Sequence, residues 1–175
     1  GVLAHFEVHS PRVIYMATLG KAAGVIGAFV AGEAEVVETL IQRARAYIYT
    51  TAAPALLSVA LMKSLELIRD GESRRHHLQA LIARLRERLK PERWRLLPSQ
   101  TAIQPLVIGS SDEAVAVSES LAREGMLVPA IRPPTVPKGT ARLRISLSAA
   151  HAIEDVERLA AALDMIERAV PSSET

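Results

Sequence analysis

One lysine, Lys21, stands among small residues in the segment 17–24, ATLGKAAG. It is the first lysine of the chain, and the next is Lys63. If the turn around it is partly apolar, burial disfavours the charged ammonium form, and a neutral amine forms a Schiff base with an aldehyde. The neighbouring glycines and alanines leave room for a flat ring to approach the backbone. The segment therefore indicates covalent chemistry at Lys21.

A Gly-Lys pair that follows a strand also occurs in two settings without such chemistry. The first is an ordinary turn with no function, which the local spacing leaves open. The second is a phosphate-binding P-loop, which requires Gly at position 15 and Ser or Thr at position 22. The chain has Tyr15 and Ala22 at these positions, so the P-loop is excluded.

A second segment with chemical potential is 47–54, YIYTTAAP, which places two tyrosines and two threonines before Pro54. Proline suits the first turn of a helix. The segment is interpreted as a connector between two helices, capped by Thr51 or Ala52. The alternative is a group of hydroxyls that bind a phosphate.

A third segment is 131–139, IRPPTVPKG, with three prolines in five residues. Prolines restrict the backbone and reduce the entropy lost on folding, so this loop is predicted to hold its side chains in place. The planar guanidinium of Arg132 suits a carboxylate. A rigid surface turn with a solvated arginine fits the local pattern equally well.

No metal site is predicted. His5 and His9 are four residues apart, but Phe6 stands where the helix of zinc proteases has Glu. His76 and His77 fall on a charged helix face and are expected to be solvated. The chain has no cysteine, which excludes disulfides, thiolate metal sites and a cysteine nucleophile, and fits the cytoplasm.

The composition is that of a globular protein, with 175 residues, 49% apolar and 23% charged. No apolar stretch is long enough to cross a bilayer, so a membrane protein is not expected. Basic residues concentrate between positions 74 and 95, but leucines recur among them at helical spacing. The arginines then occupy the solvated face of an amphipathic helix, and aromatic residues for stacking are scarce, which disfavours nucleic-acid binding.

Hydrophobic periodicity predicts an α/β protein whose second half is a two-layer α+β unit. The strand at 12–17 is expected to be buried, and the helix at 112–124 to bury Val115, Leu121 and Ala122. The predicted strands are 12–17, 27–32, 94–97, 103–108, 126–131 and 142–148. The predicted helices are 33–46, 54–69, 73–90, 112–124 and 154–169.

Three stretches together resemble the α-oxoamine synthases: 18–22 (TLGKA), 47–51 (YIYTT), and 131–137 (IRPPTVP) with 141–151 (ARLRISLSAAH). These are pyridoxal-phosphate enzymes of the aspartate aminotransferase-like fold, fold type I. The resemblance implies the end of a large cofactor-binding α/β domain at 1–70 and a connecting helix at 71–92. A small α+β domain at 93–170 and a tail at 171–175 would follow.

The resemblance also implies roles for individual residues. Lys21 would hold the pyridoxal phosphate covalently and later remove the α-proton of the amino acid. Thr18 would hydrogen-bond the cofactor phosphate, and Thr51 would reach the phosphate in the neighbouring subunit, which requires a homodimer. Arg132 and Thr135 would help to hold substrate or product.

The 131–137 stretch is most similar to the branch of the family that joins L-alanine to a pimeloyl thioester, carried by CoA or acyl carrier protein, in biotin synthesis. Family members carry about as many residues again before this region, including groups that hold the cofactor. This chain is therefore expected to be a partial enzyme with little activity alone. The alternatives are another branch, which makes aminolevulinate or 2-amino-3-oxobutyrate, and a non-catalytic fragment or dimerisation module.

Overall fold

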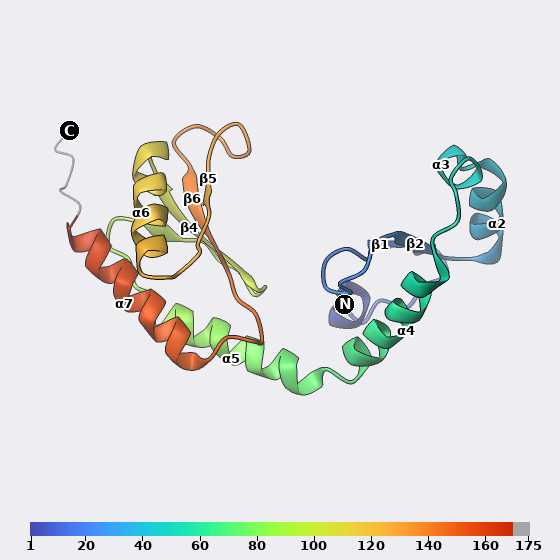
Figure 1. Ribbon diagram of the computed structural model, residues 1–175, viewed down its shortest axis with the longest axis horizontal. Coiled ribbons are helices and arrows are strands. Elements are labelled where there is room, and N and C mark those ends of the chain that lie inside the picture. Colours follow the sequence, from blue (N-terminus) through green and yellow to red (C-terminus); the bar gives the residue numbers. More distant parts are fainter. Residues whose placement is uncertain (170–175) are drawn as a thin grey trace. The chain divides into compact units, whose positions relative to one another are not determined.

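The computed structural model describes residues 1–169 and divides into two compact units (Figure 1). Unit 1 is Gly1–Gly71, and unit 2 begins at Glu72. The finer division expected from the sequence, with a separate connecting helix at 71–92, stays a prediction. The predicted tail at 171–175 lies outside the described residues.

Unit 1 consists of a β-hairpin and helices. Its strands β1 and β2 are antiparallel, with Tyr15 opposite Ala31 and Thr18 opposite Ala28. The strands and helices expected in this region are present with shifted ends, but β1 is not buried, because its side chains alternate between half-buried and exposed. The elements are α1 (Val2–His5), β1 (Tyr15–Thr18), β2 (Ala28–Ala31), α2 (Ala34–Arg43), α3 (Arg45–Ile48) and α4 (Ala55–Arg69).

Unit 1 leaves most of its apolar side chains exposed. Leu19, 9% exposed, is the one large apolar side chain of this unit that is buried by the described residues. Along α4, Leu56, Val59 and Met62 are 76%, 65% and 67% exposed. A helix that is apolar on several sides is normally covered by other parts of a protein. The apolar side chains of Leu56, Val59 and Met62 on α4 thus form a surface that the rest of unit 1 leaves uncovered.

Unit 2 is a four-stranded antiparallel sheet in the order β3-β4-β6-β5, with helices packed against it. Leu106 of β4 lies opposite Leu143 of β6, and α6 lies beside the strands (Figure 1). This is the two-layer α+β arrangement expected from the sequence. The elements are α5 (Glu72–Arg88), β3 (Arg95–Leu96), β4 (Ile103–Gly109), α6 (Ser111–Arg123), β5 (Ala130–Ile131), β6 (Ala141–Ser146) and α7 (Ile153–Ala169).

The core of unit 2 is aliphatic and is closed by side chains from every layer. Of the leucines predicted at helical spacing in this region, Leu81, Leu85 and Leu89 are buried and Leu78 is half-buried. The inward residues of β6 are buried as well. Trp94, 4% exposed, completes the cluster. The largest fully buried side chains are Leu81, Leu85, Leu89, Leu106, Leu121, Leu143, Ile145, Leu163, Gln104, Val117 and Val156.

Two predictions for unit 2 are wrong in detail. In α6 the buried side chains are Ala114, Val117 and Leu121. Ala122 is exposed and Val115 half-buried, because each lies one residue, about 100° around the helix, from the inner face. The strand expected at 126–131 is reduced to its last two residues.

His77 is also not solvated as expected. Its ring nitrogen Nε2 lies 2.9 Å from the backbone oxygen of His151, and the residue is half-buried. This contact ties α5 to the loop before α7. Among residues 1–169, no helix combines the length and apolar character needed to cross a membrane.

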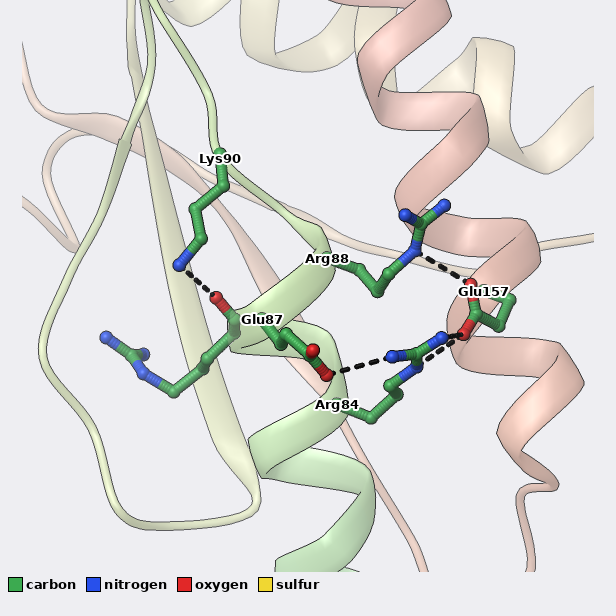
Figure 2. A network of polar contacts seen from close by, with 6 residues as sticks. Arg84, Glu87, Arg88, Lys90 and Glu157 are labelled. Carbon is green, nitrogen blue, oxygen red and sulfur yellow. Dashed lines mark hydrogen bonds and ion pairs between the residues drawn. The ribbon is translucent and has the colours of Figure 1, made fainter.

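A network of ion pairs joins α5 to α7 (Figure 2). Arg84 donates to Glu157 and, at 2.8 Å, to Glu87, while Nε of Arg88 donates to Glu157 at 2.9 Å. The hydrogen bond from Arg84, supported by the one from Arg88, lowers the pKa of the Glu157 carboxyl against the opposing effect of burial. The arginines predicted to be solvated thus partly serve to hold two helices together.

Candidate functional site

Lys21 lies in the loop 19–27 that connects β1 to β2, and the backbone of this loop is folded on itself. The N–H of Leu19 donates to the oxygen of Gly27 at 2.8 Å, and that of Val25 donates to the oxygen of Leu19 at 2.9 Å. Within this frame the N–H of Gly24 donates to the oxygen of Lys21 at 2.9 Å. The lysine therefore opens a hydrogen-bonded turn of four residues.

Two glycines of this loop have backbone angles that other residues rarely adopt. The φ angle is +65° at Gly24 and +114° at Gly27. A Cβ atom at Gly24 would meet nothing within 4 Å, so the requirement there is conformational and not one of space. The open side of Gly24 leaves the loop accessible.

The Lys21 side chain is exposed, and the partly apolar environment expected for it is not provided by the described residues. The physical reason is local. Its neighbours Gly20 and Ala22 are too small to cover a lysine, and unit 1 has no cluster of buried apolar side chains that could enclose the amine. Any burial of the amine must come from another polypeptide segment or a bound molecule.

Thr18 is the last residue of β1 and is exposed, three positions before Lys21. The structure therefore brings these two predicted residues to the same end of the hairpin. A hydroxyl and an amine presented together can bind a ligand that carries both a phosphate and an aldehyde.

Thr51 is exposed in the segment between α3 and α4. The predicted cap is wrong, because the N-cap residue of α4 is Pro54, which makes no side-chain cap. The neighbouring Thr50 hydroxyl donates to the oxygen of Ala46 and is thus used within its own helix end. In the described part of the chain, no hydrogen bond joins Thr51 to Thr18 or Lys21.

Arg132 and Thr135 lie in unit 2, where they are the first and last residues of one tight turn. The N–H of Thr135 donates to the oxygen of Arg132 at 3.0 Å, and Pro133 and Pro134 fill the centre. Both predicted residues are exposed. The turn directly follows β5, so it is anchored to the edge of the sheet.

Arg144, which was not among the residues predicted from the sequence, shares this region. Along β6, Leu143 and Ile145 face the helices, so Arg142 and Arg144 point to the opposite face of the sheet. Arg142 lies opposite Ile131 in β5 and donates to the oxygen of Thr140 at 3.0 Å. Arg144 is exposed, and no ion pair of its side chain occurs among residues 1–169. The strict alternation of β6 was the signal that could have identified it.

Acidic and histidine side chains do not gather into a metal-binding group of three or more within residues 1–169. The candidate residues offer an amine and hydroxyls in unit 1, and separately guanidinium groups and a hydroxyl in unit 2. The amine of unit 1 suits carbonyl chemistry, and the guanidinium groups of unit 2 suit anionic ligands.

Comparison with known proteins identifies the family. A family model described as aminotransferase class I and II matches residues 2–163. The chain belongs to this family. The resemblance seen in the three sequence stretches is thereby confirmed.

Curated relatives in the aminotransferase class I and II family agree on one name. The chain is 64% identical over 168 residues to 8-amino-7-oxononanoate synthase of Nitrosospira multiformis. This match covers 96% of this chain and 42% of that protein. It is 61% identical over 169 residues to the enzyme of the same name from Methylobacillus flagellatus, covering 97% and 43%. The chain thus spans less than half the length of these relatives.

A solved structure confirms the predicted fold class. The crystal structure of 8-amino-7-oxononanoate synthase from Francisella tularensis superposes with a TM-score of 0.77 at 29% identity. The match covers 89% of this chain and 45% of that one. Since the two chains share this fold, the described elements are a part of the aminotransferase architecture.

Proposed function

We propose that this chain is part of a pyridoxal-phosphate-dependent acyltransferase, 8-amino-7-oxononanoate synthase, and that it carries the lysine that binds the cofactor. The whole enzyme condenses L-alanine with a pimeloyl thioester, with loss of carbon dioxide, in biotin synthesis. The observation that carries the proposal is the 64% identity to a protein of that name over 96% of this chain. The proposed location is the cytoplasm, which suits a chain without cysteine.

The residues of unit 1 fit this cofactor. Lys21 presents an exposed amine and Thr18 an exposed hydroxyl at one end of the hairpin, and the open side of Gly24 leaves room beside them. These groups suit an aldehyde and a phosphate on one molecule. When bound, pyridoxal phosphate supplies an electron sink that stabilises negative charge at the α-carbon of alanine.

Each residue then has a defined task. The amine of Lys21 accepts the proton that leaves the alanine α-carbon, as a positioned general base does. The hydroxyl of Thr18 donates to the phosphate, and that of Thr51 donates to the phosphate in a second copy, so the enzyme is proposed to be a homodimer.

The residues of unit 2 bind the carboxylates of substrate or product. Arg132 offers a planar pair of N–H groups from a turn with restricted backbone, and Thr135 adds a hydroxyl at the other end of that turn. Arg144 is a further candidate, because it is an exposed cation without a described ion pair. An arginine fork binds a carboxylate through two parallel hydrogen bonds, which fixes its orientation.

The cofactor assignment is tested on the purified chain. Pyridoxal phosphate is added, the adduct is reduced with borohydride, and labelled peptides are mapped by mass spectrometry. We expect the label at Lys21 to exceed that at the exposed Lys138, and to vanish in Lys21→Ala. Equal labelling of Lys21, Lys63, Lys90 and Lys138 would contradict an organised site.

The reaction itself is tested in a chimera. The region of the Nitrosospira multiformis enzyme that matches this chain is replaced by residues 1–169, and condensation of L-alanine with pimeloyl-CoA is measured. We expect activity in the chimera, none in its Lys21→Ala variant, and little from this chain alone. A soluble chimera that binds pyridoxal phosphate but forms no product would overturn the proposed reaction.

A further inference from the structure

Helix α4 reaches the loop of Lys21 through one hydroxyl. The side-chain oxygen of Ser64 donates to the backbone oxygen of Ala23 at 2.6 Å, across 41 positions of sequence. Ser64 is half-buried, as are Leu57 and Leu61 on the same helix. These three residues are spaced i, i+4 and i+7, so they form the least exposed face of α4.

The acceptor of this bond belongs to a peptide group that is held at both ends. Its oxygen, on Ala23, accepts from Ser64, and its N–H, on Gly24, donates to the oxygen of Lys21 at 2.9 Å. Rotation of this peptide plane would break both bonds. The hydroxyl of Ser64 therefore fixes the turn that begins at Lys21.

A serine within a helix usually has a local acceptor. Its hydroxyl commonly bonds the carbonyl oxygen four residues earlier, as the hydroxyls of Thr39 and Thr50 do with Glu35 and Ala46 in this unit. Ser64 instead reaches out of its helix to another part of the chain. The contact is therefore a tertiary restraint on the loop and not a by-product of helix geometry.

We propose that Ser64 is a positioning residue for Lys21, which clamps the Ala23–Gly24 peptide and so presents the lysine amine in one direction. The inference rests on the proposed function, in which Lys21 binds the cofactor. Its physical basis is preorganisation: a lysine on a fixed turn does not have to lose the freedom of that turn when it meets the aldehyde.

The first test follows amide hydrogen exchange in the purified chain, without cofactor. In Ser64→Ala we expect the N–H of Gly24 to exchange roughly three- to tenfold faster, because a hydrogen bond of ordinary net strength is lost. The amides that join β1 to β2 should keep their rates. The matched control is Ser58→Ala, an exposed serine of the same helix, and Ser64→Thr, which keeps a hydroxyl, should restore slow exchange.

Four results would overturn the clamp. One is an unchanged rate at Gly24 in Ser64→Ala, and another is a Gly24 amide that is already unprotected in the parent chain. The third is equal acceleration throughout the hairpin and α4, which would show that Ser64 only stabilises the unit. Ser64→Thr with the rates of Ser64→Ala would contradict a role of the hydroxyl.

The second test links the clamp to Lys21 and separates it from the proposed function. Borohydride-trapped pyridoxal phosphate is quantified as the ratio of label at Lys21 to label at Lys138, and we expect this ratio to fall about three- to tenfold in Ser64→Ala. An unchanged ratio, with Lys21 still labelled above Lys138, refutes positioning but leaves the proposed function standing. A loop that loosens in Ser64→Ala while Lys21 is never labelled above Lys138 refutes the proposed cofactor site at Lys21 in this chain and retains the clamp.

Discussion

The buried carboxylate of Glu167 offers a sharp test of how unit 2 is held together. Glu167 is 8% exposed and accepts backbone N–H groups from Glu92, Arg93 and Trp94 at 3.2, 2.8 and 2.9 Å. These three residues form the turn between α5 and β3, so the end of α7 organises a distant segment. We expect Glu167→Ala to destabilise unit 2 strongly.

The magnitude follows from the surroundings of each donor. Trp94 is buried, so its N–H cannot bind water instead, and the loss of its hydrogen bond to Glu167 costs about 1–3 kcal/mol. Glu92 and Arg93 are exposed, so their N–H groups can bind water instead, and each lost hydrogen bond lowers the unfolding free energy by about 0.5–1 kcal/mol. The expected loss of unfolding free energy is therefore about 3 kcal/mol. In Glu167→Gln an amide oxygen still serves Arg93 and Trp94, which limits the loss to about 1–2 kcal/mol.

The assay is equilibrium unfolding in urea, followed by fluorescence. Trp94 is the one tryptophan of the chain, and it lies in the affected turn, so the signal reports unit 2. With a slope of about 2 kcal/mol per M, a loss of 3 kcal/mol lowers the midpoint by about 1.5 M urea. Glu119→Ala, at an exposed position of α6, is the matched control and should stay within about 0.5 kcal/mol. A loss below about 1 kcal/mol in Glu167→Ala, or an equal loss in Glu167→Gln, would refute the reasoning.

Three further predictions concern the two units. Because the pKa of Glu157 is lowered in the folded state, its carboxylate stabilises the fold at pH values above the ordinary pKa of 4.5. This stabilisation is lost as the pH falls through the lowered pKa. Glu157→Gln should therefore lower the urea midpoint at pH 7, and a difference that persists at pH 2 would contradict this. Leu85→Ala should cost unit 2 about 2–5 kcal/mol, measured in the same assay, whereas Leu56→Ala at its exposed position should leave that midpoint unchanged. Limited proteolysis with mass spectrometry should yield a resistant fragment that begins near residue 72, and cleavage spread evenly over both units would contradict it.

The sequence predicted unit 2 well because its signals are local and mutually consistent. The alternation of Leu143 and Ile145 with arginines defines an inner face of β6, and the leucines of α5 recur at helical spacing. Both patterns match the buried core. One error arose in α6 because adjacent apolar residues compete for the inner face: Ala114 is buried in place of Val115, and Ala122 is exposed beside the buried Leu121. The other arose at 126–131, where irregular backbone shortens the strand.

The candidate site was predicted less completely. The turn of Lys21 between two strands and the tight turn at Arg132 follow from small residues and prolines that act locally. The exposure of Lys21 could not be predicted, since burial depends on segments that approach from elsewhere. The contact between Ser64 and Ala23 joins positions 41 residues apart, and no periodicity in the sequence signals such a bond.

The exposure of Lys21 and the exposure of apolar side chains in unit 1 have a common physical cause under the proposed function. Leu56 and Met62 on α4 are among the most exposed apolar side chains of the described residues, and a surface of this kind is normally covered. The chain corresponds to 42% of the Nitrosospira multiformis enzyme, so the whole proposed enzyme has polypeptide to cover it. The same cover would remove water from the surroundings of the lysine amine, which protects an adduct with the aldehyde from hydrolysis. Trapping at Lys21 should therefore be more efficient in the chimera than in this chain, and equal efficiency would show that the amine gains nothing from the added polypeptide.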